Sequence, residues 1–161
     1  MNIFHDEHIA LLKVILKHDV NFILVGGVAV NFYGYSRPTG DLDVWLQPTE
    51  SNKNKLVGAL RELEIFSEDI ELISKSDFTA PLAFHIGSTP PFVIDFLTKI
   101  TGVNWDEAWE MRFTEKIDNL SIPFIHFTHL KQNKMISGRA KDLNDLSQLL
   151  RIEELRKNKK I

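Results

Sequence analysis

Two short motifs in the first third of the chain combine residue types that suit phosphate chemistry. A glycine pair, Gly26-Gly27, ends one apolar run, and two acids, Asp41 and Asp43, lie one residue apart in the next. A strand that ends in Gly-Gly and turns into a helix exposes backbone N–H groups and the positive end of a helix dipole to an anion. Alternate residues of a strand point the same way, so we expect both carboxylates to face one space.

A third acid, Asp95, interrupts the run from Phe92 to Leu97, which is apolar enough to be buried on both faces. An ionised carboxylate in such a place is costly unless it is paired or binds a metal. Taken alone, Asp95 suggests a structural ion pair with an arginine or a lysine. Taken with Asp41 and Asp43, it suggests three carboxylates that repel one another unless a cation lies among them. Magnesium suits such oxygen ligands, and nucleotide phosphates commonly complete its coordination.

The hydrophobic periodicity predicts the strands and helices that must position these residues. We expect strands over four runs and one hairpin, namely 21–25, 42–46, 82–86, 92–97, and 113–116 paired with 122–127. We expect helices over 6–18 and 28–33, after a cap at Thr49 or Ser51, after Asn104, from a cap at Thr128 to Gly138, and around Leu143, Leu146 and Leu150. Residues 65–81 are ambiguous, and an irregular strand is one interpretation. This order of elements indicates an α/β or α+β sheet with helices packed on it.

Length and composition are those of an ordinary globular protein. The 161 residues are 43% hydrophobic and 25% charged, which is enough for one core and one domain. The net charge of −3 is uneven, because residues 1–130 carry 10 basic and 18 acidic side chains while residues 131–161 carry 9 basic and 4 acidic. The basic region can bind a polyanion or can be a solvated helix. Cysteine, a signal peptide and membrane-length apolar runs are all absent, so we expect a cytoplasmic protein with no membrane partner.

The glycine pair, the Asp-x-Asp pattern and the later acid resemble the signature of the nucleotidyltransferase superfamily related to DNA polymerase beta. More narrowly, two patterns resemble the abortive-infection and type IV toxin nucleotidyltransferases: Arg37-x-Thr39-x-Asp41-Leu-Asp43 and Lys134-x-x-x-x-Arg139-x-Lys141-Asp142-x-x-Asp145. The resemblance covers about residues 21–150. It implies one domain over residues 1–161, with a mixed sheet flanked by helices in a core of about 21–127 and a helical part of about 128–161.

The resemblance also implies an activity. The expected enzyme uses Mg²⁺ or Mn²⁺ to transfer a nucleoside monophosphate from ATP or another nucleoside triphosphate to a hydroxyl on RNA, a protein or a small molecule. Asp41, Asp43 and Asp95 are the implied catalytic residues and metal ligands, and Asp95 is also the implied general base. The implied nucleotide-binding residues are Gly26, Gly27, Arg37, Thr39, Lys134, Arg139 and Lys141. An operon partner protein is the implied macromolecular partner.

One departure favours a second function. Many members of the superfamily carry serine after the first glycine to hold a phosphate, whereas this chain has Gly27 followed by Val28. Ser36 or Thr39 is the candidate replacement. The alternative function is a catalytically degenerate module that acts by binding, for example as one half of a toxin–antitoxin pair.

The basic residues and the histidines have alternative interpretations of their own. Arg37, Lys134 and Lys141 can be solvated surface charges, and the acid that follows Lys141 suggests capping chemistry at a helix start. His85, like the other late histidines, is too isolated in the sequence to indicate a site.

Overall fold

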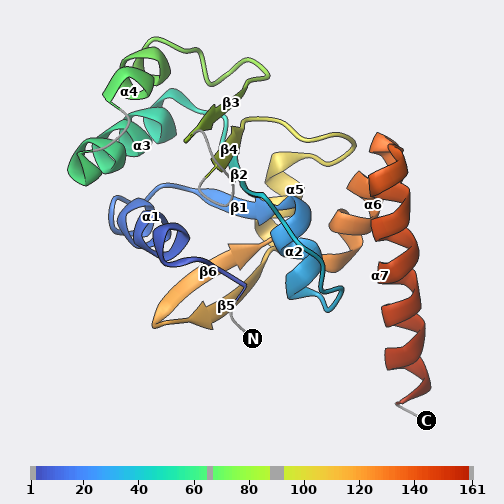
Figure 1. The fold of residues 1–161 in the computed structure, drawn as a ribbon. Coiled ribbons are helices and arrows are strands. Elements are labelled where there is room, and N and C mark those ends of the chain that lie inside the picture. Colours follow the sequence, from blue (N-terminus) through green and yellow to red (C-terminus); the bar gives the residue numbers. More distant parts are fainter. Residues whose placement is uncertain (1–2, 65–66, 88–92, 160–161) are drawn as a thin grey trace.

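The computed structural model describes residues 3–64, 67–87 and 93–159 (Figure 1). The described helices are α1 (Asp6–Lys17), α2 (Gly26–Phe32), α3 (Glu50–Leu63), α4 (Ser67–Ser74), α5 (Trp105–Met111), α6 (Phe127–Ser137) and α7 (Ala140–Asn158). The strands are β1 (Phe22–Val25), β2 (Asp41–Leu46), β3 (Ala83–Ile86), β4 (Val93–Leu97), β5 (Phe113–Ile117) and β6 (Leu120–Phe124). The protein therefore has the α+β class that the sequence predicts, with helices at its C-terminal end. Phe92, the predicted start of one strand, lies outside the described residues.

The strands form one mixed sheet in the order β3-β4-β2-β1-β6-β5. Strand β2 pairs parallel with β4, β1 pairs parallel with β6, and the other neighbours are antiparallel. All four residues of β1 are buried, because this strand lies in the middle of the sheet with neighbours on both sides. The crossovers bring β2 and β4 together although about 50 residues separate them. This parallel pair carries the acids singled out above.

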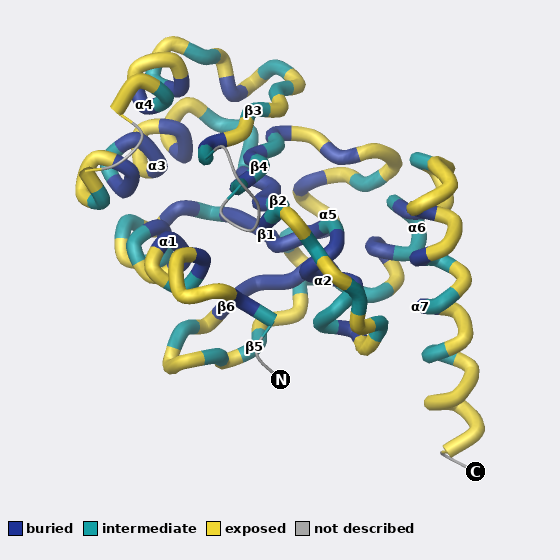
Figure 2. The backbone as a smooth tube through the Cα atoms, in the orientation of Figure 1, coloured by how far each residue is buried: buried dark blue, intermediate teal, exposed yellow. Residues whose placement is uncertain are grey.

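Helices lie on both sides of the sheet. Figure 1 shows α1, α3 and α4 on one side and α2, α6 and α7 on the other. Figure 2 shows that burial is concentrated in the central strands and in the helix faces against them, while most of α7 is exposed. Helix α5 packs against β2 through aromatic rings. The Trp105 ring meets the buried Trp45 ring edge-on and stacks on Trp109. These aromatic contacts fix α5 against β2.

Local signals predict several helix boundaries correctly. Thr49 caps α3 by accepting a hydrogen bond from the Asn52 N–H, and Asn104 caps α5 in the same way. Gly138 ends α6 with a left-handed φ of +64°. The prediction that Thr128 caps α6 is wrong, because the cap is His126, two residues earlier, and it accepts the hydrogen bond from the Thr128 N–H.

The interpretation of residues 65–81 as an irregular strand is also wrong. Residues 67–74 form α4, in which Ile70 and Ile73 are buried three positions apart and Glu68 and Asp69 occupy the first turn. Spacing of three places both isoleucines on one helix face, and acids in the first turn complement the helix dipole. Residues 65 and 66 lie outside the described residues.

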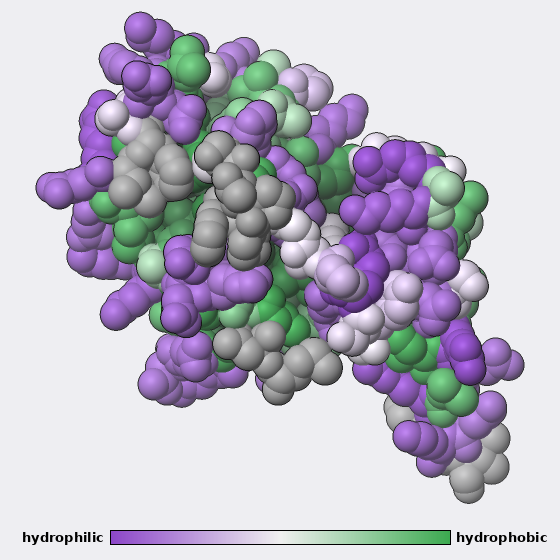
Figure 3. All heavy atoms as spheres, in the orientation of Figure 1, coloured by the Kyte–Doolittle hydropathy of each residue, from purple (hydrophilic) through white to green (hydrophobic). Residues whose placement is uncertain are grey.

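Helix α7 turns its polar side inward. Its buried residues are Asp142, Asp145 and Leu149, while the side chains of Leu143 and Leu150 are 49% and 47% exposed. Figure 3 shows apolar patches among polar residues along this helix. Within residues 3–64, 67–87 and 93–159, no helix is long and apolar enough to cross a membrane. The inward acids of α7 lie beside the pocket described next.

Candidate active site

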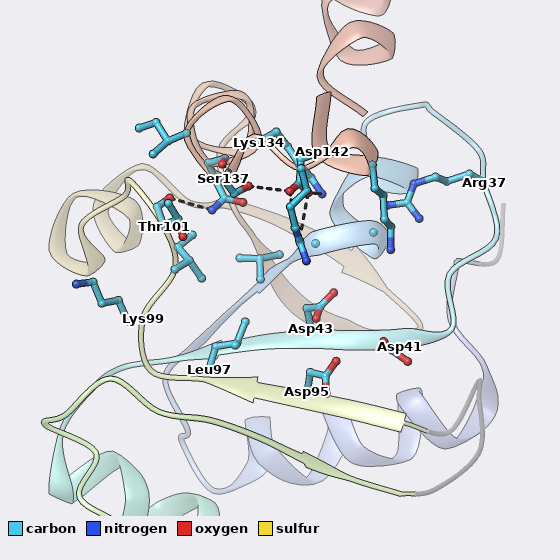
Figure 4. Close-up of a pocket in the computed structure, with 18 residues that line it drawn as sticks. Arg37, Asp41, Asp43, Asp95, Leu97, Lys99, Thr101, Lys134, Ser137 and Asp142 are labelled. Carbon is cyan, nitrogen blue, oxygen red and sulfur yellow. Dashed lines mark hydrogen bonds and ion pairs between the residues drawn. The ribbon is translucent and has the colours of Figure 1, made fainter. Parts of the chain in front are cut away.

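A pocket of about 610 Å³ lies between the sheet and the helices α6 and α7 (Figure 4). That volume is within the range of small-molecule sites. The residues predicted as functional that line it are Gly26, Gly27, Arg37, Asp41, Asp43, Asp95, Lys134, Arg139 and Lys141. Thr39 is not a lining residue, although its methyl group packs over Gly27. Residues from β2, β4, α6 and α7 thus meet in one cavity.

The sheet register places the acids side by side. In the parallel pair of β2 and β4, Asp43 lies directly opposite Asp95, and Asp41 is two residues before Asp43 on the same strand. Figure 4 shows Asp43 and Asp95 projecting from these neighbouring strands toward the cavity. The charge of Asp41 raises the pKa of both of the other carboxylates. The three acids therefore form one electrostatic group.

Burial and the repulsion of neighbouring carboxylates disfavour ionisation of Asp43 and Asp95. Burial, followed by the charges of Asp95 and Asp41, raises the pKa of Asp43 to about 6, although Lys134 and Lys141 oppose the shift. Burial and Asp41 likewise raise the pKa of Asp95. Among the described residues, none of the three acids forms an ion pair with a lysine or arginine. The structural ion pair considered for Asp95 is therefore not found in this part of the chain.

The three carboxylates suit a hard divalent cation by their chemistry. They offer only oxygen ligands, which Mg²⁺ and Mn²⁺ prefer, and a cation would offset the repulsion that, after burial, raises the pKa values of Asp43 and Asp95. Within the described residues, no group of three or more His, Cys, Asp or Glu side chains is already close enough to hold a metal ion. The donor set fits a divalent metal by its chemistry.

Gly26 makes room for Asp43. Its φ is +63°, and a Cβ atom at this position would lie 2.0 Å from Oδ2 of Asp43. Any side chain here would therefore displace the carboxylate and would also occupy a backbone conformation that L-residues rarely adopt. The first glycine of the pair is required by the close approach of the backbone to this acid.

We expect Gly26→Ala to be much more harmful than Gly138→Ala. Both glycines have nearly the same positive φ, +63° and +64°, but a Cβ at Gly138 meets nothing closer than 3.7 Å. Gly138→Ala therefore measures backbone strain alone, about 1 kcal/mol. Gly26→Ala adds the collision with Asp43, so thermal unfolding should show a clearly larger loss of stability. Equal losses in the two variants would contradict this account of Gly26.

The bases on the opposite wall are tied to two buried acids of α7. Arg37 donates from Nε and Nη2 to the two carboxylate oxygens of Asp145, both at 2.8 Å. Lys134 lies 2.9 Å from Asp145 and 3.2 Å from Asp142, and Arg139 donates to Asp142 at 2.7 Å. Asp142 and Asp145 are 1% and 0% exposed. Three bases share two acids, so a positive charge remains on this wall.

The exposure of each basic side chain tests whether it is a solvated surface charge. The Lys134 residue is only 4% exposed and the Arg37 side chain 13%, so the solvated-surface interpretation is wrong for both. Arg139 is paired, yet its side chain is 75% exposed. Lys141 is exposed at the rim of the pocket, and its charge acts on Asp43. The two exposed bases are free to approach a ligand, whereas Arg37 and Lys134 are fixed.

Asp142 and Asp145 belong to the late motif that begins at Lys134, but no role in the site was predicted for them. Burial alone would raise the pKa of Asp142, but hydrogen bonds from Arg139, Ser137 and Lys134 outweigh it and lower the pKa to about 2. For Asp145, contacts with Arg37 and Lys134 likewise outweigh burial and lower the pKa. The spacing of the two acids could have indicated that they act together. Two acids three residues apart in a helix share one face, and here they follow a series of basic residues that they could pair with.

The structure also gives His85 a neighbour that the sequence did not reveal. In the antiparallel pair of β3 and β4, His85 lies directly opposite Asp95, and its charge lowers the pKa of that acid. The row across the sheet thus runs Val25, Asp43, Asp95 and His85. Only the strand register could have shown this contact.

Comparison with models of known protein families finds no match, and comparison with curated proteins finds none.

Proposed function

We propose that this protein is a magnesium- or manganese-dependent nucleotidyltransferase that moves a nucleoside monophosphate from a nucleoside triphosphate to a hydroxyl acceptor. The observation that carries the proposal is the pairing of Asp43 with Asp95 across β2 and β4, beside Asp41 and opposite a basic wall. One wall suits divalent cations and the other suits phosphates. A pocket of about 610 Å³ joins them. These features together match the requirements of a metal–triphosphate complex better than those of either ligand alone.

Asp41, Asp43 and Asp95 are the proposed metal ligands. When bound, the metal supplies charge neutralisation at the phosphates and lowers the pKa of the acceptor hydroxyl. Asp95 accepts the proton of that hydroxyl. The acceptor oxygen then forms a bond to the α-phosphorus, and the bond from this phosphorus to the oxygen of the leaving pyrophosphate breaks. Lys134, Arg139 and Lys141 stabilise the negative charge that accumulates on the pyrophosphate.

The chemical class of the acceptor is inferred from the positive charge of the C-terminal region. RNA is the favoured class, since the chain from Lys131 onward carries 9 basic and 4 acidic residues. A protein or small-molecule hydroxyl is the alternative. The motif resemblance to the abortive-infection and type IV toxin enzymes adds a partner protein from the same operon. We place the activity in the cytoplasm, where nucleoside triphosphates and Mg²⁺ are abundant.

A second candidate is a degenerate binding module. Two observations favour it: position 27 offers no hydroxyl, and the acids within the described residues are not already closed around a metal site. The two candidates differ in their response to ATP with Mg²⁺. An enzyme should gain thermal stability from this ligand pair, whereas a degenerate module should show no shift.

The proposal is tested by transfer assays. The protein is incubated with each labelled nucleoside triphosphate, Mg²⁺, and either total RNA, protein or small-molecule acceptors. We expect label on one acceptor class, and we expect Asp41→Ala and Asp43→Ala to abolish it. Absence of transfer by the unmodified protein, or equal transfer by these variants, would refute the proposal.

The raised pKa of Asp43 predicts a pH-dependent stability difference in the metal-free protein. A carboxyl whose pKa is about 6 when folded and near 4 when unfolded destabilises the folded state as pH rises through this window. Asp43→Asn should therefore stabilise the protein in EDTA at pH 8, by up to about 3 kcal/mol at 1.36 kcal/mol per pKa unit. The gain should disappear at pH 4.

This pH experiment has an internal control. The low-pKa acids Asp142 and Asp145 are present in both proteins, so their contribution, which is lost as pH falls, cancels in the difference. Urea unfolding at both pH values measures the difference in the free energy of unfolding between Asp43→Asn and the unmodified protein. A difference that is the same at pH 4 and pH 8 would show that ionisation of Asp43 does not oppose folding.

A further inference from the structure

The space over Gly27 is filled by two side chains from the loop before β2. A Cβ atom on Gly27 would lie 2.7 Å from Cγ2 of Thr39 and 3.3 Å from both Nη1 and Nη2 of Arg37. The first distance is shorter than real Cβ contacts allow. Position 27 therefore has no room for a side chain, and a guanidinium group lies where a side chain would extend. Gly27 and Thr39 fit together only because the glycine has no Cβ.

Arg37 is held in this position by several partners. Its backbone N–H donates to Oδ1 of Asn31 at 2.9 Å, and its Nη1 donates to the Pro38 carbonyl at 3.2 Å. Its Nε and Nη2 donate to the carboxylate of Asp145. A guanidinium has five N–H groups, and these contacts use three of them. Among the described residues, one N–H on each Nη has no hydrogen-bond partner, and these are the two nitrogens that lie over Gly27.

The charge of this group is only partly cancelled. Asp145, the acid that accepts from the Arg37 fork, is 0% exposed and is shared with Lys134 at 2.9 Å. One carboxylate between two cations leaves positive charge beside Gly27. An anion bound there would meet a fixed guanidinium fork, which fits phosphate oxygens better than a single hydroxyl does.

We propose that Arg37 is the phosphate-binding residue over the glycine pair, that it replaces a side chain at position 27, and that Asp145 is a positioning residue that fixes its guanidinium plane. The ligand is the terminal phosphates of a nucleoside triphosphate, so the inference rests on the function proposed above. Thr39 contributes shape, because its methyl group closes the space beside the fork.

The test uses inorganic tripolyphosphate, which binds without any transfer reaction, and isothermal titration calorimetry. Arg37→Met should raise the dissociation constant about 10- to 100-fold, the value of one or more hydrogen bonds to a charged group. Arg37→Lys keeps the charge but loses the fork, and should give a smaller loss. Arg151→Met makes the same change on the exposed outer face of α7 and should leave binding unchanged. Circular dichroism verifies that each variant is folded.

Two further variants separate positioning and shape from charge. Asp145→Asn keeps the shape of the side chain but frees the fork, and should raise KM for the triphosphate more than it lowers kcat. Gly27→Ser should weaken tripolyphosphate binding because the new Cβ meets the Thr39 methyl group, and Gly27→Ser with Thr39→Ser, which lacks that methyl, should recover part of it. If Arg37→Met does not fold, the double variant Arg37→Met with Asp145→Asn is titrated in its place, because it also removes the buried acid that has lost its arginine partner.

The outcomes distinguish this inference from the proposed function. Folded Arg37→Met, or its double variant, that binds tripolyphosphate as tightly as the unmodified protein would overturn the inference even if transfer still depends on Asp43. Failure of the unmodified protein to bind tripolyphosphate would also overturn it. Binding that depends on Arg37 without any nucleotide transfer would support the inference and contradict the enzymatic function.

Discussion

Replacing Asp43 by asparagine is expected to lower nucleotide transfer by at least about 10³-fold, because a metal contributes several kcal/mol and each 1.36 kcal/mol is tenfold in rate. Asp43 is the acid with the most crowded environment. It lies opposite Asp95, and a Cβ on Gly26 would touch its carboxylate. Asparagine keeps the shape but offers one neutral oxygen ligand instead of a charged pair. Single-turnover assays at saturating Mg²⁺ measure the loss.

The control for this prediction is Asp118→Asn in the turn between β5 and β6. Asp118 is exposed and has a φ of +48°, a conformation that asparagine adopts readily, so the same chemical change should leave transfer unaltered. Because Asp43→Asn removes a buried charge, we expect the metal-free variant to be more stable than the unmodified protein at pH 8 even though it is inactive. An active Asp43→Asn protein would exclude the carboxylate site as the catalytic centre.

Asp145→Ala is expected to cost about 3–5 kcal/mol of folding stability, the usual effect of removing one partner of a buried ion pair. The change leaves the Arg37 fork and the Lys134 ammonium without this carboxylate, and Lys134 is itself only 4% exposed. Both cations come from outside α7, so the loss should also loosen α7 from the pocket. Urea unfolding followed by circular dichroism measures the change in the free energy of unfolding.

Glu153→Ala is the matched control on the same helix. Glu153 pairs with Lys131 at 2.9 Å, but the two side chains are 30% and 20% exposed. Ion pairs open to solvent are worth about 1 kcal/mol or less. If Asp145→Ala is no more destabilising than Glu153→Ala, the buried network does not hold α7 in place.

The parts of the fold that follow from local sequence were predictable. Apolar runs located the strands, although β6 covers Leu120–Phe124 rather than the predicted 122–127. Thr49 and Gly138 marked helix ends, and Asp41 and Asp43 were recognised by their spacing. These features depend on a few consecutive residues, and their physical causes, such as capping and strand alternation, act at that range.

The parts that depend on distant residues were not predictable. The chemistry of the three acids predicted that Asp41, Asp43 and Asp95 converge, but the direct pairing of Asp43 with Asp95 is set by the register of β2 and β4, which local sequence does not determine. The apolar spacing within α7 predicted a helix, but the sheet side of α7 faces ion pairs, so Leu143 and Leu150 point to solvent. Asp145 was missed because its partner Arg37 lies 108 residues away.

The most direct test of the central claim is a crystal structure with Mn²⁺ and a non-hydrolysable nucleoside triphosphate, in which anomalous scattering locates the metal. We predict a metal peak about 2.2 Å from carboxylate oxygens of Asp41, Asp43 and Asp95, with the triphosphate extending toward Lys134. A metal peak elsewhere, or a bound triphosphate with no metal at these three acids, would contradict the account.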